Sequence, residues 1–182
     1  MAETTQWTSQ LDQITNTVKS EFGDLSSEDL NKKPSPDQWS IAQNIDHLIV
    51  INESYYPILK QLHEGTFQLP FMGKLGFYVK WMGNMILKYV EPARRKKTKT
   101  QSIWEPATST IDADIVQRFV THQDQLKKHI QSCSSFVDAG VVIYSPASKA
   151  ILYTLEQAFN IIVTHEKRHL NQAREVFTSL RA

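Results

Sequence analysis

Two histidines in the C-terminal part of the chain have a spacing suited to metal binding. His165 and His169 are four residues apart. On an α-helix, residues i and i+4 lie on one face, so both imidazoles can point at the same ion. A second helix that carries His47 past this pair would complete a three-histidine site. Three imidazole ligands with one open coordination position are typical of catalytic rather than closed structural sites, and they suit Zn, Ni or Fe.

The apolar pattern around these histidines indicates that they face the interior. With about 100° of rotation per residue, His165, His169 and Glu166 fall on the apolar face of their helix, and Gln172 lies at its border. His47 falls just beyond the edge of the apolar stripe on its own segment. Buried polar groups without partners are costly, and a metal ion would be such a partner. The alternative is a chance spacing on one helix and a core-packing histidine on the other.

Three further polar residues are candidates for roles beside the metal. Glu166 is the nearest carboxylate that can act as a general base or orient a ligand, although it can equally face solvent in a salt bridge. Asn44 and Gln172 can hydrogen-bond a ligand or a metal-bound water. For His122 and His129, surface or helix-packing roles are favoured over a role in the site. Cys133, the sole cysteine, is expected to be a small buried hydrophobe.

Long helices are needed to position these residues, and the chain has the composition for them. It contains 6 Gly and 7 Pro in 182 residues, and the alternating pattern of β-strands is nearly absent. Four amphipathic helices favour an all-α four-helix bundle, in which metal sites form between facing helices. Pro57 is expected to kink the second helix or to end it early. The predicted helices cover residues 5–22, 40–65, 112–133 and 150–180, and residues 24–40 and 134–148 are expected to be connectors.

The long connection between the second and third helices, residues 66–110, is interpreted as an insertion. It predicts an extra amphipathic helix over residues 74–90, rich in aromatic residues and Met. This helix can cover the site, form a dimer interface or lie on a membrane surface, and packing against the bundle is favoured. The basic run Arg94–Lys99 that follows is expected to be a solvated loop. A connection of this length also permits a crossover between the flanking helices.

Composition narrows the class of protein. With 182 residues and 41% hydrophobic content, the chain is expected to form one domain, residues 1–182. A formal net charge of +1 gives no reason to expect a nucleic acid or a membrane as partner. The single cysteine excludes an intramolecular disulfide, and no signal peptide or spanning segment is visible. We therefore expect a soluble, cytoplasmic protein.

The motifs around the three histidines resemble those of the DinB-like superfamily, which includes the YfiT-type metal-dependent hydrolases. The similarity rests on Trp39-Ser40 at a helix start, on His47-Leu48, and on a His-x-x-x-His-x-x-Gln pattern formed by His165, His169 and Gln172. It extends over nearly the whole chain. The resemblance implies a four-helix bundle of up-down-down-up topology and identifies His47, His165 and His169 as three metal ligands.

The resemblance also implies a range of functions. Some relatives are metal-dependent S-transferases that use a low-molecular-weight thiol, others are classed as hydrolases, and relatives often form homodimers. The chain is accordingly expected to be a metal-dependent thiol S-transferase or small-molecule hydrolase. The alternative is a non-catalytic bundle that binds a metal, a ligand or a partner and acts as an interaction module.

Overall fold

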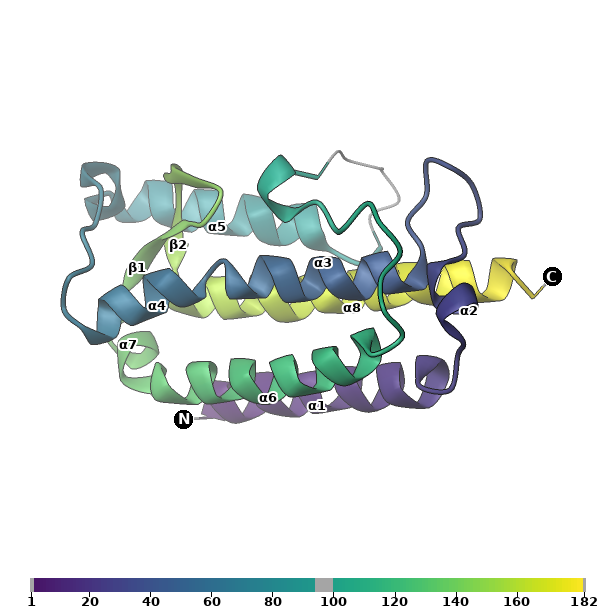
Figure 1. The fold of residues 1–182 in the computed structure, drawn as a ribbon. Coiled ribbons are helices and arrows are strands. Elements are labelled where there is room, and N and C mark those ends of the chain that lie inside the picture. Colours follow the sequence, from purple (N-terminus) through teal and green to yellow (C-terminus); the bar gives the residue numbers. More distant parts are fainter. Residues whose placement is uncertain (1, 94–99, 182) are drawn as a thin grey trace.

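Four long helices pack side by side and form the body of the molecule (Figure 1). The structure, a computed structural model, describes residues 2–93 and 100–181. Both α1 and α3 contact both α6 and α8, so each helix has two neighbours. The prediction of a mainly helical fold is therefore confirmed. These helices are α1 (Ala2–Phe22), α3 (Ile41–Glu53), α6 (Ile115–Ser132) and α8 (Leu155–Ser179).

The helices enter the bundle from two ends. Figure 1 shows α1 and α8 starting at the end where α3 and α6 finish. Because α3 and α6 run in the same direction, the chain must return along the whole bundle between them. The long connection that follows α4 (Tyr56–His63) carries it back.

A layer of polar side chains divides the apolar core into two parts. One buried cluster contains Leu11, Leu126 and Phe159, and the other contains Phe119 and Val176. Buried polar residues lie between these two apolar clusters along three of the four helices. They are Asn52 on α3, His122 and Gln123 on α6, and Glu166 and His169 on α8. Such groups need partners in the interior, so this layer is where function is expected.

Side-chain caps define where the two site helices begin. Ser40 and Gln43 form a capping box at the start of α3, and Thr154 and Gln157 form another at the start of α8. Each box satisfies backbone donors that the first helical turn leaves free. The caps therefore fix where α3 and α8 begin, and these two helices carry the site histidines.

The second predicted helix is in fact two helices. Helix α3 ends at Glu53, and α4 begins at Tyr56 with Pro57 in its first turn. Proline is tolerated there because its missing N–H would have no intrahelical partner. The expectation that Pro57 marks a kink or an early end is confirmed.

A β-hairpin precedes α8, and the prediction of helix from residue 150 was wrong. Strand β1 (Val142–Ser145) pairs antiparallel with β2 (Ser148–Thr154), with Ile143 opposite Tyr153. Both of these side chains are buried. The apolar spacing of Leu152, Leu155 and Phe159 imitates a helical face. The capping box at Thr154 marks the true start of α8.

The insertion forms a helix that covers one side of the bundle. Helix α5 (Gly76–Val90) packs on α8 and β2, and buries Val79, Met82 and Val90. Its predicted range, 74–90, is confirmed closely. A Cβ on Gly83 would clash with the Gln157 side chain, so glycine permits the close approach of α5 to α8. The basic run Arg94–Lys99, predicted to be a solvated loop, lies outside the described residues.

Short elements complete the described fold. None of the described helices combines the length and apolar character needed to cross a membrane. The short elements are α2 (Ser27–Asn31), α7 (Ser134–Asp138), η1 (Phe71–Lys74) and η2 (Ser102–Trp104).

Candidate metal centre

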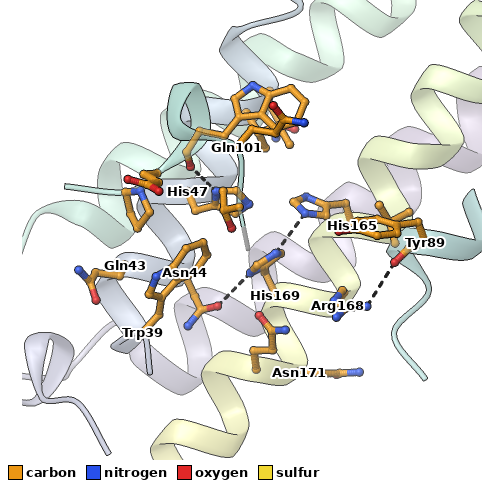
Figure 2. Close-up of a pocket in the computed structure, with 18 of the residues that line it drawn as sticks. Trp39, Gln43, Asn44, His47, Tyr89, Gln101, His165, Arg168, His169 and Asn171 are labelled. Carbon is orange, nitrogen blue, oxygen red and sulfur yellow. Dashed lines mark hydrogen bonds between the residues drawn. The ribbon is translucent and has the colours of Figure 1, made fainter. Parts of the chain in front are cut away.

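Three imidazoles from α3 and α8 converge in the polar layer. Candidate ligand nitrogens of His47, His165 and His169 all lie within 4.8 Å of one another. Their ring centroids are 4.4 to 5.2 Å apart. Figure 2 shows the three rings facing a common point, with Asn44 behind His169. The structure thus brings together the three histidines that the sequence singled out.

Hydrogen bonds fix the tautomers of two of these rings. His47 donates from Nδ1 to the carbonyl oxygen of Trp104 at 2.6 Å. His169 donates from Nδ1 to Oδ1 of Asn44 at 2.9 Å. Asn44 in turn donates from Nδ2 to the carbonyl of Ser40, which orients its oxygen toward the ring. Since both Nδ1 atoms carry hydrogen, both Nε2 atoms keep a lone pair for a metal.

His165 supplies the third imidazole of the candidate metal site. Nε2 of His165 lies 3.1 Å from Nε2 of His169. Ligands at about 2.0–2.1 Å from a tetrahedral ion are separated by roughly 3.3 Å. Two imidazole nitrogens at this distance either share a hydrogen or bind one cation together. The donor set therefore fits a divalent metal.

The surroundings keep the three imidazoles neutral. Burial lowers the pKa of His47 below its usual range, although the Trp104 carbonyl and Asp46 partly oppose this. Burial, and then the neighbouring histidines and Arg168, hold the pKa of His165 and that of His169 well below the usual range. Metal ligation requires neutral imidazole, so the site is ready to bind a cation at neutral pH.

The end of η2 and the loop that follows it are hydrogen-bonded to α3 and to Ser54 beside the histidines. In addition to the His47 bond, the Asp46 carboxylate accepts from the Ala107 N–H at 3.0 Å, and Gln43 donates to the Ala107 carbonyl at 3.0 Å. Nε1 of Trp104 donates to Ser54 at 3.0 Å. Sequence reasoning did not find these contacts, because three of the four bonds use backbone atoms of Trp104 and Ala107.

A cavity of about 1300 Å³ opens at the three histidines, larger than the roughly 300–1,000 Å³ of typical small-molecule sites. Trp39 stacks on His169 with ring centroids 5.7 Å apart and forms one wall. Gln172, predicted to contact a ligand, lines the cavity, as does Arg168. Arg168 also donates to the Glu91 carbonyl at 3.1 Å, which ties the end of α5 to α8. The cavity is therefore large enough to hold a small molecule beside the three histidines.

Comparison with known proteins identifies the family. The model of the DinB superfamily matches residues 10–173. The chain belongs to the DinB superfamily. An uncharacterized protein, YuaE of Bacillus subtilis (strain 168), is 31% identical over 157 residues, which cover 86% of this chain and 88% of that protein. No solved structure gives a significant match. The resemblance inferred from the motifs is thus confirmed, and DinB membership together with the three-histidine cluster fits metal binding.

The cavity of this DinB-superfamily protein is also lined by three hydroxyl side chains, those of Tyr55, Ser145 and Tyr153. The hydroxyls of Tyr55 and Tyr153 lie 2.8 Å apart, and Ser145 Oγ accepts from the Ala147 N–H at 3.3 Å.

Glu166 lies in the polar layer but has partners of its own. Its carboxylate accepts from Asn52 and from Gln123, both at 2.8 Å. The side chain is fully buried, so the alternative of a solvent-facing salt bridge is wrong. Burial raises its pKa to about 7, against the two amide hydrogen bonds. The structure shows Glu166 bonded to amides rather than to a site histidine, and its predicted catalytic role stays a prediction.

The other histidines and the cysteine stand apart from the three ligands. His122 is buried beside Asn52 and Tyr56, and His129 packs against the Tyr56 ring at 4.2 Å. Cys133 is fully buried, and burial raises the pKa of its thiol. The interpretation of these residues as packing residues agrees with their places in the structure.

Proposed function

We propose that this DinB-superfamily protein holds one divalent metal ion, Zn, Ni or Fe, on His47, His165 and His169. The observation that carries the proposal is the convergence of three neutral imidazoles, two of which are held by carbonyl acceptors with Nε2 toward the common point. Hydrogen bonds of this kind orient the rings of metal-binding histidines.

We further propose that the protein is a metal-dependent enzyme, either a thiol S-transferase that uses a low-molecular-weight thiol or a small-molecule hydrolase. A metal held by three histidines supplies Lewis acidity that lowers the pKa of a coordinated water or thiol. The chain supports this chemistry with a cavity that has room for a substrate beside the histidines. Trp39 shields the rings, and Gln172 offers an amide to a bound molecule.

The proposal also covers the topology, the location and the oligomeric state of the protein. The helix directions in Figure 1 support the up-down-down-up topology within a single domain. A cytoplasmic location and homodimer formation are proposed from the lone cysteine and from the family respectively.

A second candidate function is a non-catalytic interaction module. It is favoured by the exposed large apolar side chains of the insertion, such as Phe77 and Trp81. Such groups on a protein surface often mark a binding site.

Elemental analysis tests the metal site. Protein purified without an affinity tag should contain about one metal ion per chain, as expected for a single three-histidine centre. His165→Ala should lose most of it. The matched control is His129→Ala, which removes a histidine outside the cluster and should keep the metal. Equal metal content in wild type and His165→Ala would reject the site.

Activity assays separate the two candidate functions. Wild type and His47→Ala are compared for thiol conjugation of an electrophile and for ester and amide hydrolysis, with His129→Ala as control. An enzyme should lose its reaction in His47→Ala alone. A protein that binds metal stoichiometrically but shows neither reaction would favour the interaction module.

A further inference from the structure

The exposed large apolar side chains are confined to one region of the molecule. Among the described residues, all of them lie between Phe71 and Ile103. Phe71 is 73% exposed, Phe77 is 76% and Trp81 is 58%. The rest of the described surface exposes no large apolar side chain of this kind. A concentration of this sort is unusual for a surface that faces only water.

These side chains form a continuous stripe along α5. Phe77, Trp81, Met85 and Tyr89 are spaced four residues apart and therefore lie along one side of the helix. The opposite side of α5 is buried against α8 and β2. Figure 1 shows α5 on the outer side of the bundle, away from α1 and α6. The stripe thus faces outward.

The charge on this face has one sign. Residues 65–90 contain Lys74, Lys80 and Lys88 and no Asp or Glu. All three lysines are exposed. Lys149, also exposed, lies on β2, which packs against α5. The next carboxylate in the sequence, Glu91, comes after the end of α5. Exposed aromatic residues mixed with lysines are typical of helices that lie in the headgroup region of a membrane.

We propose that the outward face of α5, together with Phe71 and Met72 of η1, docks on an anionic lipid bilayer. The aromatic side chains would enter the headgroup region while the lysines contact lipid phosphates. A second copy of the chain fits this face less well. A symmetric α5-to-α5 contact would bring lysines together with no carboxylate on the face to neutralise them. This inference replaces the expectation, drawn from net charge alone, that a membrane is not a partner.

The docking face adjoins the metal cavity. Met85 and Tyr89 belong to the exposed stripe and also line the cavity. A molecule docked through this face would hold one rim of the cavity against the lipid. The inference goes beyond the proposed function, since lipid docking requires neither the metal nor any reaction.

Vesicle flotation tests the proposal. Wild-type protein should float with vesicles that mix phosphatidylcholine and phosphatidylglycerol, and should bind pure phosphatidylcholine vesicles much less. Phe77→Ser/Trp81→Ser should lower the partition coefficient at least about tenfold, because two exposed aromatic anchors are removed. Lys80→Glu/Lys88→Glu should lower it by roughly fivefold or more per lysine, with a steep salt dependence.

Matched variants keep the test decisive. Lys19→Glu/Lys128→Glu changes the same charge on α1 and α6, away from α5, and should bind vesicles like wild type. His165→Ala should also bind like wild type, so a failed metal site cannot imitate a failed docking face. Circular dichroism checks that each variant is folded. The proposal is overturned if wild type stays with the buffer, or if sedimentation velocity shows a dimer that Phe77→Ser/Trp81→Ser dissolves while no variant floats.

Discussion

The polar layer of the bundle contains two clusters that share helices but differ in how their polar atoms are satisfied. In the metal cluster, His47 and His169 bond outward through Nδ1, and their Nε2 atoms face a common point with His165. In the carboxylate cluster, Glu166 is bonded on both oxygens by Asn52 and Gln123. One cluster has spare acceptors that converge beside a cavity. The other uses both carboxylate oxygens of Glu166 within the protein, and leaves Gln123 Oε1 without a partner among the described residues.

This difference distinguishes a cluster suited to binding a cation from a cluster that stabilises the packing of the helices. Buried polar groups that satisfy one another stabilise a single arrangement of helices, whereas imidazole nitrogens that converge on one point can bind a cation together. Both clusters look alike in the sequence, since His165 and Glu166 are neighbours on the same apolar face. Variants should therefore affect metal affinity in one cluster and folding stability in the other.

The largest effect is expected from His169→Ala. Affinity for Zn²⁺ should fall roughly a hundredfold to a thousandfold, because the ~10–16 kcal/mol of a four-ligand zinc site amounts to about 2.5–4 kcal/mol per ligand. A competition titration with a chromophoric chelator measures the loss of Zn²⁺ affinity. Cooperative unfolding of the metal-free variant should persist. Unchanged affinity would remove His169 from the metal cluster.

Glu166→Ala should show the reverse pattern. The free energy of unfolding should fall by about 3 kcal/mol, because two buried amide donors lose their acceptor and a cavity remains. Glu166→Gln should lose less, since it keeps one acceptor oxygen. Urea unfolding gives both values, and elemental analysis should find wild-type metal content. A variant that keeps its stability but loses the metal would move Glu166 into the metal cluster.

Acid should weaken the carboxylate cluster through His122. Burial, and then the charge of His129, lower the pKa of His122 from 6.5 to about 4. As the pH falls, His122 is protonated in the unfolded chain before it is protonated in the folded protein. The free energy of unfolding is therefore unaffected by His122 above pH 6.5 and decreases as the pH falls toward 4. The loss amounts to roughly 3 kcal/mol.

The measurement is urea unfolding of metal-free wild type and His122→Gln at pH 7.5 and at pH 4.5, with acid sensitivity expected to be smaller in the variant. Contributions from the three site histidines are common to both proteins and cancel in the difference. Equal acid sensitivity would show that His122 is not held neutral.

The smallest effect is expected from Asn44→Leu. Loss of the acceptor for His169 Nδ1 should weaken Zn²⁺ binding about ten- to hundredfold, the usual range when a partner of a metal-binding histidine is removed. Asn44→Asp keeps an acceptor oxygen and should recover much of the affinity. The same chelator titration applies. If Asn44→Leu binds like wild type, the tautomer of His169 is set by something other than this hydrogen bond.

Much of the site was predictable because it follows from helical spacing. His165 and His169 share a face whatever surrounds them, and the apolar stripes predicted the long helices. The hairpin was missed because Leu152 fits both a strand and the helical spacing of Leu155 and Phe159. The signal that could have found it is the Thr154 and Gln157 capping pair, which places the helix start after the strand.

The sequence by itself determined the helices, the three histidines and the family motifs, because these depend on local periodicity and residue type. Only the tertiary structure decided which polar neighbours converge on the candidate metal site and which bond elsewhere in the core. Glu166 turns to Asn52 and Gln123, and His47 meets the backbone carbonyl of Trp104, 57 residues away. A backbone carbonyl has no residue type to read, and long-range hydrogen bonds depend on how the helices pack. For that reason the orientation of the metal centre emerges only in the folded chain.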